Sequence, residues 1–443
     1  MSAILHRNLV SAPPLAVRGE GIYLFDAAGR RYIDASGGAA VSCLGHSSPR
    51  VVEAIARQAA LLPFAHTAFF TSEPAEALAA HLVAHAPEGF GAGRAAFVGS
   101  GSEAMEVALK LARQVAVERG EARRSHLIGR RMSYHGNTLG ALSVGGHMAR
   151  RDLYAPLLLP VSHIDPCHAY REKREDETLA EYGLRAADQL EAEIHRVGPE
   201  TVLAFVAETV SGATLGCAPP APGYFRRIRE ICDRHGVIFI ADEVMCGMGR
   251  TGSLFVIAQE GVCPDIVTIA KGLGAGYQPI AAVLARESLV EALTDGSGAL
   301  ANGQTYMGHP VACAAALAVL ETIRDEGLLA AVRERGAELR ALLERRFGQH
   351  PHVGDIRGRG LFLALEFVQA RAERTPFRRD LRLAERLKAS LQEAGLIAYP
   401  SSGAADGVAG DHVLLAPPYI VTSAELGAIV DILERVLADI LPA

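Results

Sequence analysis

Short apolar runs alternate with helical patterns between about residues 75 and 325. The runs AAFVG, SHLIGRR, VLAFVAE, GVIFIADE, DIVTIAK and IAAVLA have the length and composition of buried strands. Between them, apolar residues recur at helical spacing, as Met105, Ala108, Ala112 and Val115 do after the first run. Strands that alternate with amphipathic helices predict an α/β fold around a mostly parallel sheet.

The two ends of the chain have a different pattern. Near the N-terminus, GIYLFDAAGRRYIDASGG predicts a hairpin around the turn at residues 26–29. After about residue 325, charged helices such as LLAAVRERGAELRALLERRF accompany two strand-like segments, GLFLALEF and DHVLLAPP. A last helix begins near Thr422, which has capping-box spacing to Glu425. This tail indicates a smaller α+β domain.

Composition narrows the class of protein. The 443 residues are 49% hydrophobic and carry a formal charge of -6 without basic runs, which argues against a nucleic-acid partner. No apolar stretch reaches the length of a membrane span, and the N-terminus lacks the pattern of a secretory signal. The seven cysteines are scattered and do not form a disulfide framework. We therefore predict a cytoplasmic protein with no nucleic-acid or membrane partner.

One group of residues has the composition of a metal site. His163, Cys167 and His168 lie close together in SHIDPCHAY, but no second cluster has ligand spacing. A loop of ordinary polar residues explains the group better than a metal site does. We predict that the protein binds no metal.

Two strand-like runs end in residues with ionisable side chains. DIVTIAK ends in Lys271, and GVIFIADE ends in Asp242 and Glu243; the aspartate precedes the lysine by 29 positions. Each alone has an ordinary structural explanation, since a lysine extends to solvent and an aspartate caps a helix. Together, however, they mark the carboxyl ends of strands, where open α/β sheets bind ligands. Pyridoxal phosphate needs a lysine and an acid facing its pyridine nitrogen, so the pair favours this cofactor.

A phosphate site has a candidate in FVGSGSEAMEVALKLAR. The strand runs into Gly99-Ser100-Gly101-Ser102 and then a helix, and Ser100 and Glu103 have capping-box spacing. Free amides at a helix start bind phosphate, although a plain helix cap explains the segment alone. The segment is neither a P-loop nor a dinucleotide fingerprint, so a nicotinamide oxidoreductase is disfavoured.

Taken together, these segments resemble the class III (ω-amino acid) aminotransferases of pyridoxal phosphate fold type I. The most specific match is IFIADEVMCGMGRTG followed by PDIVTIAKGLGAGYQPIAAVLA. SGSEAMEVALKLAR, SYHGNT, TYMGHPVACAAALAVLE and the closing APP segment agree with it. The resemblance implies a large cofactor-binding domain and a smaller α+β domain formed by both chain ends, with boundaries at residues 1–60, 61–325 and 326–443.

The resemblance also implies roles for single residues. Lys271 would form the Schiff base with the cofactor and move the substrate's proton, and Asp242 would pair with the pyridine nitrogen. Thr305 would reach the phosphate of the neighbouring subunit's cofactor, which implies a homodimer and leaves a tetramer open. The full set of cofactor-binding residues would be Gly101, Ser102, Tyr134, His135, Glu208, Asp242, Val244, Lys271 and Thr305, with Tyr134 and Val244 on the two ring faces.

The chain departs from the family where relatives hold a substrate carboxylate. Arginines of two groups of relatives fall at Leu414 and Tyr399 here, and a gating glutamate falls at Ala213. Arg357 or Arg359, the partner subunit, or backbone amides of SSGAADGVAGDH remain as alternatives, although a structural role explains the two arginines better. His66, Phe69 and Phe70 match the family's substrate entrance, although the two phenylalanines fit a core equally well.

The resulting functional hypothesis is a transaminase with a ping-pong mechanism. It would move an amino group from an ω-amino acid, a diamine or a diamino acid to pyruvate or 2-oxoglutarate. An aminomutase or a decarboxylating transaminase on the same fold is an alternative. So is a non-catalytic protein that senses the cofactor or an amine, although the lysine, the aspartate and the phosphate loop argue against it.

Overall fold

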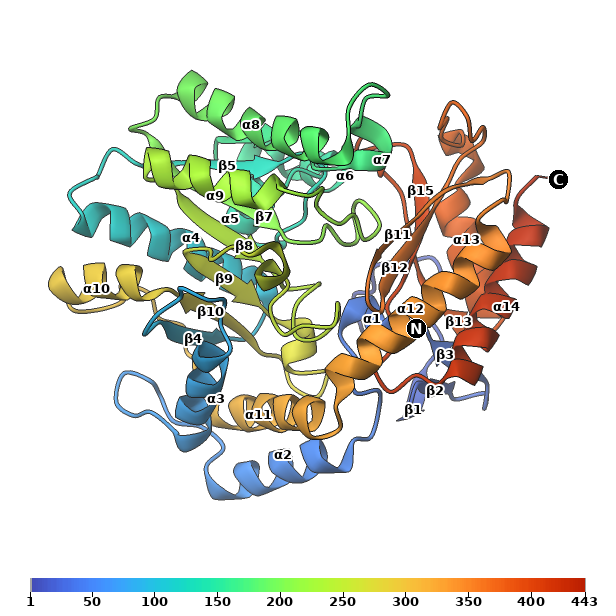
Figure 1. The fold of residues 1–443 in the computed structure, drawn as a ribbon. Helices are drawn as coiled ribbons and strands as arrows, with labels where there is room; N and C mark the ends of the chain where they lie inside the picture. The colour runs from blue at the N-terminus through green and yellow to red at the C-terminus, as the bar shows by residue number, and fades with distance from the viewer. Residues whose placement is uncertain (1, 443) are drawn as a thin grey trace.

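The computed structural model describes residues 2–442, and its centre is a seven-stranded sheet (Figure 1). The strand order is β4-β10-β9-β8-β7-β5-β6; β10 runs antiparallel to both neighbours, and all other neighbours pair in parallel. The mostly parallel sheet is thus confirmed. All six predicted runs form strands, and β6 is an addition that the pattern did not predict. The bounds are β4 Arg94–Val98, β5 His126–Arg130, β6 Val161–Ile164, β7 Val202–Glu208, β8 Ile238–Asp242, β9 Ile266–Ile269 and β10 Ala281–Ala285.

Helices cover both faces of this sheet, which explains why β7 to β10 are buried along their whole length. Val206 and Ile240 point to the face packed by α4, while Phe205 and Phe239 point to the face packed by α8 and α9. The helices of this part are α2 Pro49–Leu61, α3 Glu73–Ala84, α4 Gly101–Glu118, α5 Leu139–Val144, α6 Met148–Arg151, α7 Ala169–Glu172, α8 Leu179–Val197, α9 Tyr224–His235, α10 Glu287–Asp295 and α11 Pro310–Asp325. Short 3₁₀ helices span η1 Asp152–Leu157, η2 Ile257–Glu260 and η3 Lys271–Leu273.

The chain ends build two further sheets that share one core. The predicted hairpin joins β2 to β3, and β3 pairs in parallel with β13 from the tail. The second sheet has the order β11-β12-β15-β14. The sequence pattern did not predict β11 and β14 of this sheet, nor β13 of the first. The bounds are β1 Ala16–Glu20, β2 Tyr23–Asp26, β3 Arg31–Asp34, β11 Val353–Arg359, β12 Phe362–Phe367, β13 Leu396–Ile397, β14 Tyr399–Ser401 and β15 Asp411–Leu415, with helices α1 Gly37–Ala40, α12 Leu328–Phe347, η4 Arg379–Leu381, α13 Leu383–Glu393 and α14 Ser423–Ile440.

The last helix begins as expected. The Thr422 side chain accepts from the Glu425 amide, and the Glu425 carboxylate accepts from the Thr422 amide, so both capping-box bonds are present. The residue numbers of the domain boundaries stay predictions. No helix within residues 2–442 combines the length and the apolar character that a bilayer crossing requires.

Arg250 fastens the loop after β8 to the tail. Its side chain is fully buried and donates hydrogen bonds to the carbonyls of Leu361 and Pro417. The guanidinium carbon lies 4.7 Å from the ring centre of Tyr419, whose hydroxyl donates to the Met248 carbonyl at 2.9 Å. The segment that holds the end of the central sheet is therefore bonded directly to the C-terminal segment.

We predict that Arg250→Met destabilises the fold strongly. Each carbonyl left without a donor inside the protein costs about 1–3 kcal/mol, while the methionine retains the apolar stem. Tyr419→Phe removes one neutral hydrogen bond and serves as the mild control, with a cost of about 1 kcal/mol. Midpoints of thermal unfolding measure both, and equal midpoints for Arg250→Met and the parent protein would contradict the proposed fastening.

Candidate active site

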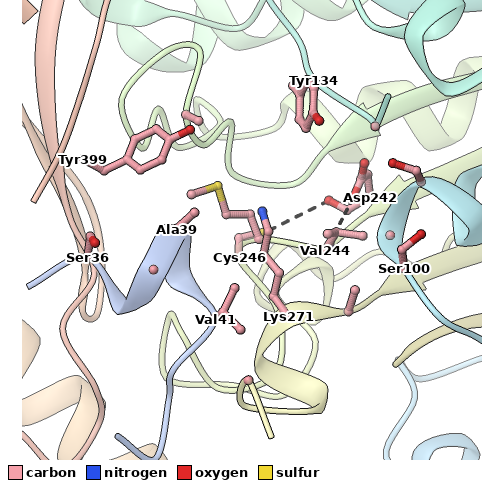
Figure 2. A pocket seen from close by; sticks show the side chains of 18 of the residues that line it. Ser36, Ala39, Val41, Ser100, Tyr134, Asp242, Val244, Cys246, Lys271 and Tyr399 are labelled. Atoms are coloured by element: carbon pink, nitrogen blue, oxygen red, sulfur yellow. Dashed lines mark hydrogen bonds between the residues drawn. The ribbon is translucent and has the colours of Figure 1, made fainter. Parts of the chain in front are cut away.

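A cavity of about 800 Å³ opens where β7, β8 and β9 end (Figure 2). It is lined by the loops after β4, β5, β7, β8 and β9, by the N-terminal segment and by the tail. Glu208 and Asp242 are the last residues of their strands and lie opposite each other in the sheet register. Two carboxylates therefore reach the same end of the sheet, and Lys271 follows the next strand.

Asp242 is held in one orientation at the end of β8. Its side chain is buried, and the amide of Val244 donates to Oδ1 at 2.9 Å. Nδ1 of the buried His135 lies 2.7 Å from Oδ2. The other ring nitrogen of His135 has no hydrogen-bond partner within the described chain. His135 therefore orients the carboxylate from behind.

Lys271 lies on the floor of the cavity, with its amine pointing up between Tyr399 and Asp242 (Figure 2). Its φ of 48° lies in the left-handed region, which non-glycine residues seldom adopt and which recurs at functional sites. Burial lowers the pKa of the Lys271 amine, and the negative charges of Asp242 and Glu208 oppose that shift only in part. The amine thus becomes neutral, and nucleophilic, at a lower pH than an exposed lysine.

The two other acids near the sheet edge have structural partners. Glu208 accepts from the amides of Tyr134 at 3.2 Å and Gly212 at 3.0 Å, and burial raises its pKa. Glu243 points away from the cavity and accepts from the Thr209 hydroxyl and from two amides of the loop that follows, at Val256 and Ile257. Burial raises the pKa of Glu243 to about 7. Of the Asp-Glu pair, only the aspartate faces the cavity.

The start of α4 offers free amides to the cavity. The Ser100 hydroxyl accepts from the Glu103 amide at 3.3 Å, while the Glu103 carboxylate accepts from Gly99 at 2.6 Å rather than from Ser100. The amides of Gly101 and Ser102 belong to the first turn, so the helix supplies them no acceptor. A Cβ on Gly101 would stand 2.8 Å from a methyl carbon of Val244, so this close approach requires glycine.

Tyr134 and Val244 lie above and below the space beside Asp242 (Figure 2). The loop that carries Tyr134 is fixed to α4, because the Asn137 amide donates to the Ser102 hydroxyl at 2.9 Å. The predicted residues of the loops after β4, β5, β7, β8 and β9 therefore meet around one space, which is wide enough for a planar ring.

A sequence profile of the family described as Aminotransferase class-III matches residues 6–437. The chain belongs to the class III aminotransferases. It is 46% identical to an uncharacterized aminotransferase of Schizosaccharomyces pombe over 97% of this chain and 94% of that protein. A mitochondrial gamma aminobutyrate transaminase of Solanum lycopersicum and a putrescine–pyruvate aminotransferase of Pseudomonas aeruginosa are each 34% identical over 96% of this chain, and over 82% and 90% of their own lengths.

The fold has close counterparts among solved structures. The omega transaminase of Pseudomonas jessenii in complex with PMP superposes with a TM-score of 0.89 at 36% identity, over 96% of this chain and 92% of that chain. Class III aminotransferases depend on pyridoxal phosphate, so the cofactor inferred from the lysine and the aspartate is confirmed.

Thr305 stands apart from the other predicted cofactor residues of this aminotransferase. It is exposed and lines a neighbouring cavity of about 530 Å³, which adjoins the cleft at Gly99 and Gln278. Within one chain it does not reach the space between Asp242 and Lys271. Its contact with the cofactor of a second subunit stays a prediction.

None of the arginines considered from the sequence reaches the cleft. Arg357 is buried and pairs with Asp355 and Glu366, and Arg359 pairs with Glu260. Leu414 is fully buried in β15. Arg357 and Arg359 as carboxylate ligands are therefore wrong for this chain, because internal acids already hold both guanidinium groups.

Of the other residues considered for the substrate cleft and its entrance, some line the cleft and others do not. Tyr399 and Ala213, which the resemblance placed where relatives carry charged residues, line the cleft. Phe69 and Phe70 are 80% and 69% exposed, so the core alternative is wrong for this chain, and neither lines the cleft. His66 also lies outside the lining.

The residues His163, Cys167 and His168 do not come together as metal ligands. Within residues 2–442 the one group with suitable geometry is Glu191, His195 and His235, on the surface of α8 and α9. Glu191 already pairs with two arginines there, so the prediction of no metal stays as it was.

Three cations that no sequence motif predicted line the cleft: Arg7, Arg150 and Lys388. The guanidinium carbon of Arg150 lies 4.4 Å from the ring centre of Tyr134. Arg150 is on the four-residue helix α6, and Lys388 is on a solvated face of α13. Neither position has a sequence pattern that distinguishes it from an ordinary surface charge.

The lowered pKa of Lys271 predicts how the cofactor-free protein takes up pyridoxal phosphate. Only the neutral amine reacts, so the rate should rise with pH and reach its midpoint below about 10.4, the value for a free lysine. Asp242→Asn should shift the midpoint further down, because its carboxylate raises the pKa of Lys271. Absorbance during rapid mixing measures this rate.

The control is Lys388→Ala, which removes another lysine of the cleft and should leave the midpoint unchanged. A pH midpoint of the uptake rate at or above about 10.4 would show that burial does not lower the pKa of Lys271. An upward shift of this midpoint in Asp242→Asn would show that the carboxylate does not raise that pKa.

Proposed function

We propose that this class III aminotransferase moves an amino group from a terminal amine to pyruvate or 2-oxoglutarate by a ping-pong mechanism. The donor would be an ω-amino acid, a diamine or a diamino acid. The observation that carries the proposal is the placement of Lys271, with its lowered pKa, beside the buried carboxylate of Asp242 at one sheet edge. The names of the relatives, which include donors of two of these types, support it.

The side chains and free amides of the cleft fit pyridoxal phosphate. The oriented carboxylate of Asp242 suits a protonated pyridine nitrogen, and the free amides of Gly101 and Ser102 suit a phosphate at a helix start. Tyr134 and Val244 would contact the two ring faces. When bound, the cofactor supplies an aldehyde that bonds amines and a ring that takes up the electron pair released at the substrate carbon.

Lys271 would perform the proton transfers. Once a donor amine replaces it, its neutral amine accepts the proton from the substrate carbon and then returns a proton to the cofactor side. The lowered pKa suits these steps, because the amine gives up its own proton more readily than an exposed lysine does. His135 keeps the Asp242 carboxylate in place, and Glu208 holds the backbone of Tyr134.

A homodimer is part of the proposal. Thr305, together with Gln304 and Tyr306, faces outward beside the cleft and would reach the cofactor of a second subunit. Two exposed aromatic residues of the same region, Phe64 and Tyr306, pack edge-to-face with their ring centres 5.7 Å apart. Both would become buried in the contact between the two subunits. A cytoplasmic location also stays a prediction.

Two alternatives to the proposed transamination are a different reaction on the same fold and a sensor without catalysis. An aminomutase or a decarboxylating transaminase would use the same lysine and aspartate and differ in which substrate bond faces the ring. A sensor without catalysis would not need an amine whose pKa is lowered by burial, so Lys271 favours an enzyme.

The deciding experiment follows each half-reaction separately. The cofactor-loaded protein is mixed with one amine and no acceptor, using β-alanine, 4-aminobutyrate, 2,4-diaminobutyrate, putrescine, alanine and glutamate in turn. We expect at least one donor to give one carbonyl product per active site, with pyruvate or 2-oxoglutarate then restoring the original absorption. Product that forms only when both substrates are present would exclude a ping-pong mechanism, and an isomerised amine would indicate an aminomutase.

A further inference from the structure

The cleft is acidic on its cofactor side and basic on its outer side. Asp242 and Glu208 are the only acids that line it within residues 2–442, and both are buried at the ends of β7 and β8. Arg7, Arg150 and Lys388 are the basic residues of the lining besides Lys271 and His135. None of these three cations forms an ion pair with a carboxylate of the described chain, so their charges are free to meet a ligand.

Arg150 is the best placed of the three cations. Arg7 and Lys388 are exposed, whereas Arg150 is half-buried, so its charge is less screened by solvent. Its guanidinium stacks on Tyr134, the residue that would cover one face of the cofactor ring. The guanidinium therefore lies against the ring, and within residues 2–442 its N–H groups donate no hydrogen bond to the chain.

The charge of Arg150 also reaches the reacting end of the site. It contributes to the lowering of the pKa of Lys271, and it lowers the pKa of the neighbouring His147 after the larger effect of burial. A substrate that bonds near Lys271 would therefore extend through the field of this guanidinium. A planar guanidinium on a fixed aromatic face is suited to bidentate binding of a carboxylate.

We propose that Arg150 binds the carboxylate of the substrate, so that the enzyme selects anionic donors and acceptors. This inference rests on the proposed transamination and names its substrate class: amino acids with a remote carboxylate, together with oxo acids. A diamine would instead place its second ammonium group against Arg150, with no acid in the outer cleft to receive it. The equal identity to relatives named for gamma aminobutyrate and for putrescine does not separate these classes, whereas the charges of the cleft do.

The test compares donors that differ only in the carboxylate. In 4-aminobutyrate and butylamine the amine and the chain are the same, and a methyl group replaces the carboxylate. We expect Arg150→Gln to lower kcat/KM of the 4-aminobutyrate half-reaction by about 10- to 100-fold, the value of one or two charged hydrogen bonds. The same variant should leave the butylamine half-reaction within about twofold of the parent protein, because no carboxylate is lost.

Binding provides a second readout that needs no turnover. Butanoate carries the carboxylate without an amine, so calorimetric titration into the cofactor-loaded protein reports the carboxylate site alone. Arg150→Gln should weaken butanoate binding about 10-fold or more, and Arg150→Lys should restore part of it as a point charge. Arg7→Gln and Lys388→Gln remove the same charge from the same cleft and should change binding much less.

Each outcome decides the proposal. Equal losses for 4-aminobutyrate and butylamine in Arg150→Gln would mean that the residue only supports Tyr134, and would overturn the inference. So would unchanged butanoate binding, or a larger loss in Arg7→Gln or Lys388→Gln. Turnover of diamines alone would also overturn it while leaving the proposed transamination intact. Butanoate binding that depends on Arg150, without reaction of any donor, would instead support the anion site and overturn the proposed function.

Discussion

The whole site depends on three neighbouring parallel strands that end at the same edge of one sheet. The register of β7 and β8 sets Glu208 opposite Asp242. β9 ends two residues before Lys271, which has a left-handed backbone conformation. An amine and two carboxylates thereby line one end of the same cavity. Loss of hydration destabilises the protonated amine more than the nearby negative charges stabilise it, so the pKa of Lys271 is lowered.

The strand ends alone would not hold these groups in place. Their loops are bonded to one another: His135 to Asp242, Tyr134 to Glu208, and Asn137 to Ser102 at the start of α4. Each bond links a loop to the end of a different strand or helix. The cavity thus has rigid walls on the side of the sheet, which is what positioning of a cofactor and its proton transfers requires.

Much of this arrangement could be predicted from the sequence, because the fully buried strands are continuous apolar runs and Lys271 and Asp242 interrupt two of them at their ends. The strands of the tail were less visible. β11 contains Arg357, Arg359 and two glycines, and its charges are neutralised only by partners distant in the sequence, such as Glu366 and Glu260. β13 and β14 are too short to show alternation. Arg150 could not be found, because its importance comes from its place over Tyr134 and not from its neighbours in the chain.

The central claim is that Lys271 is the residue that bonds the cofactor. The chain has only four lysines, and Lys388 is the other one in the cleft. Borohydride reduction of the protein loaded with pyridoxal phosphate, followed by digestion and mass spectrometry, locates the bond directly. We predict one equivalent of reduced cofactor on the peptide that contains Lys271, and none on Lys110, Lys173 or Lys388. Label on Lys388, or no stable label at all, would contradict it.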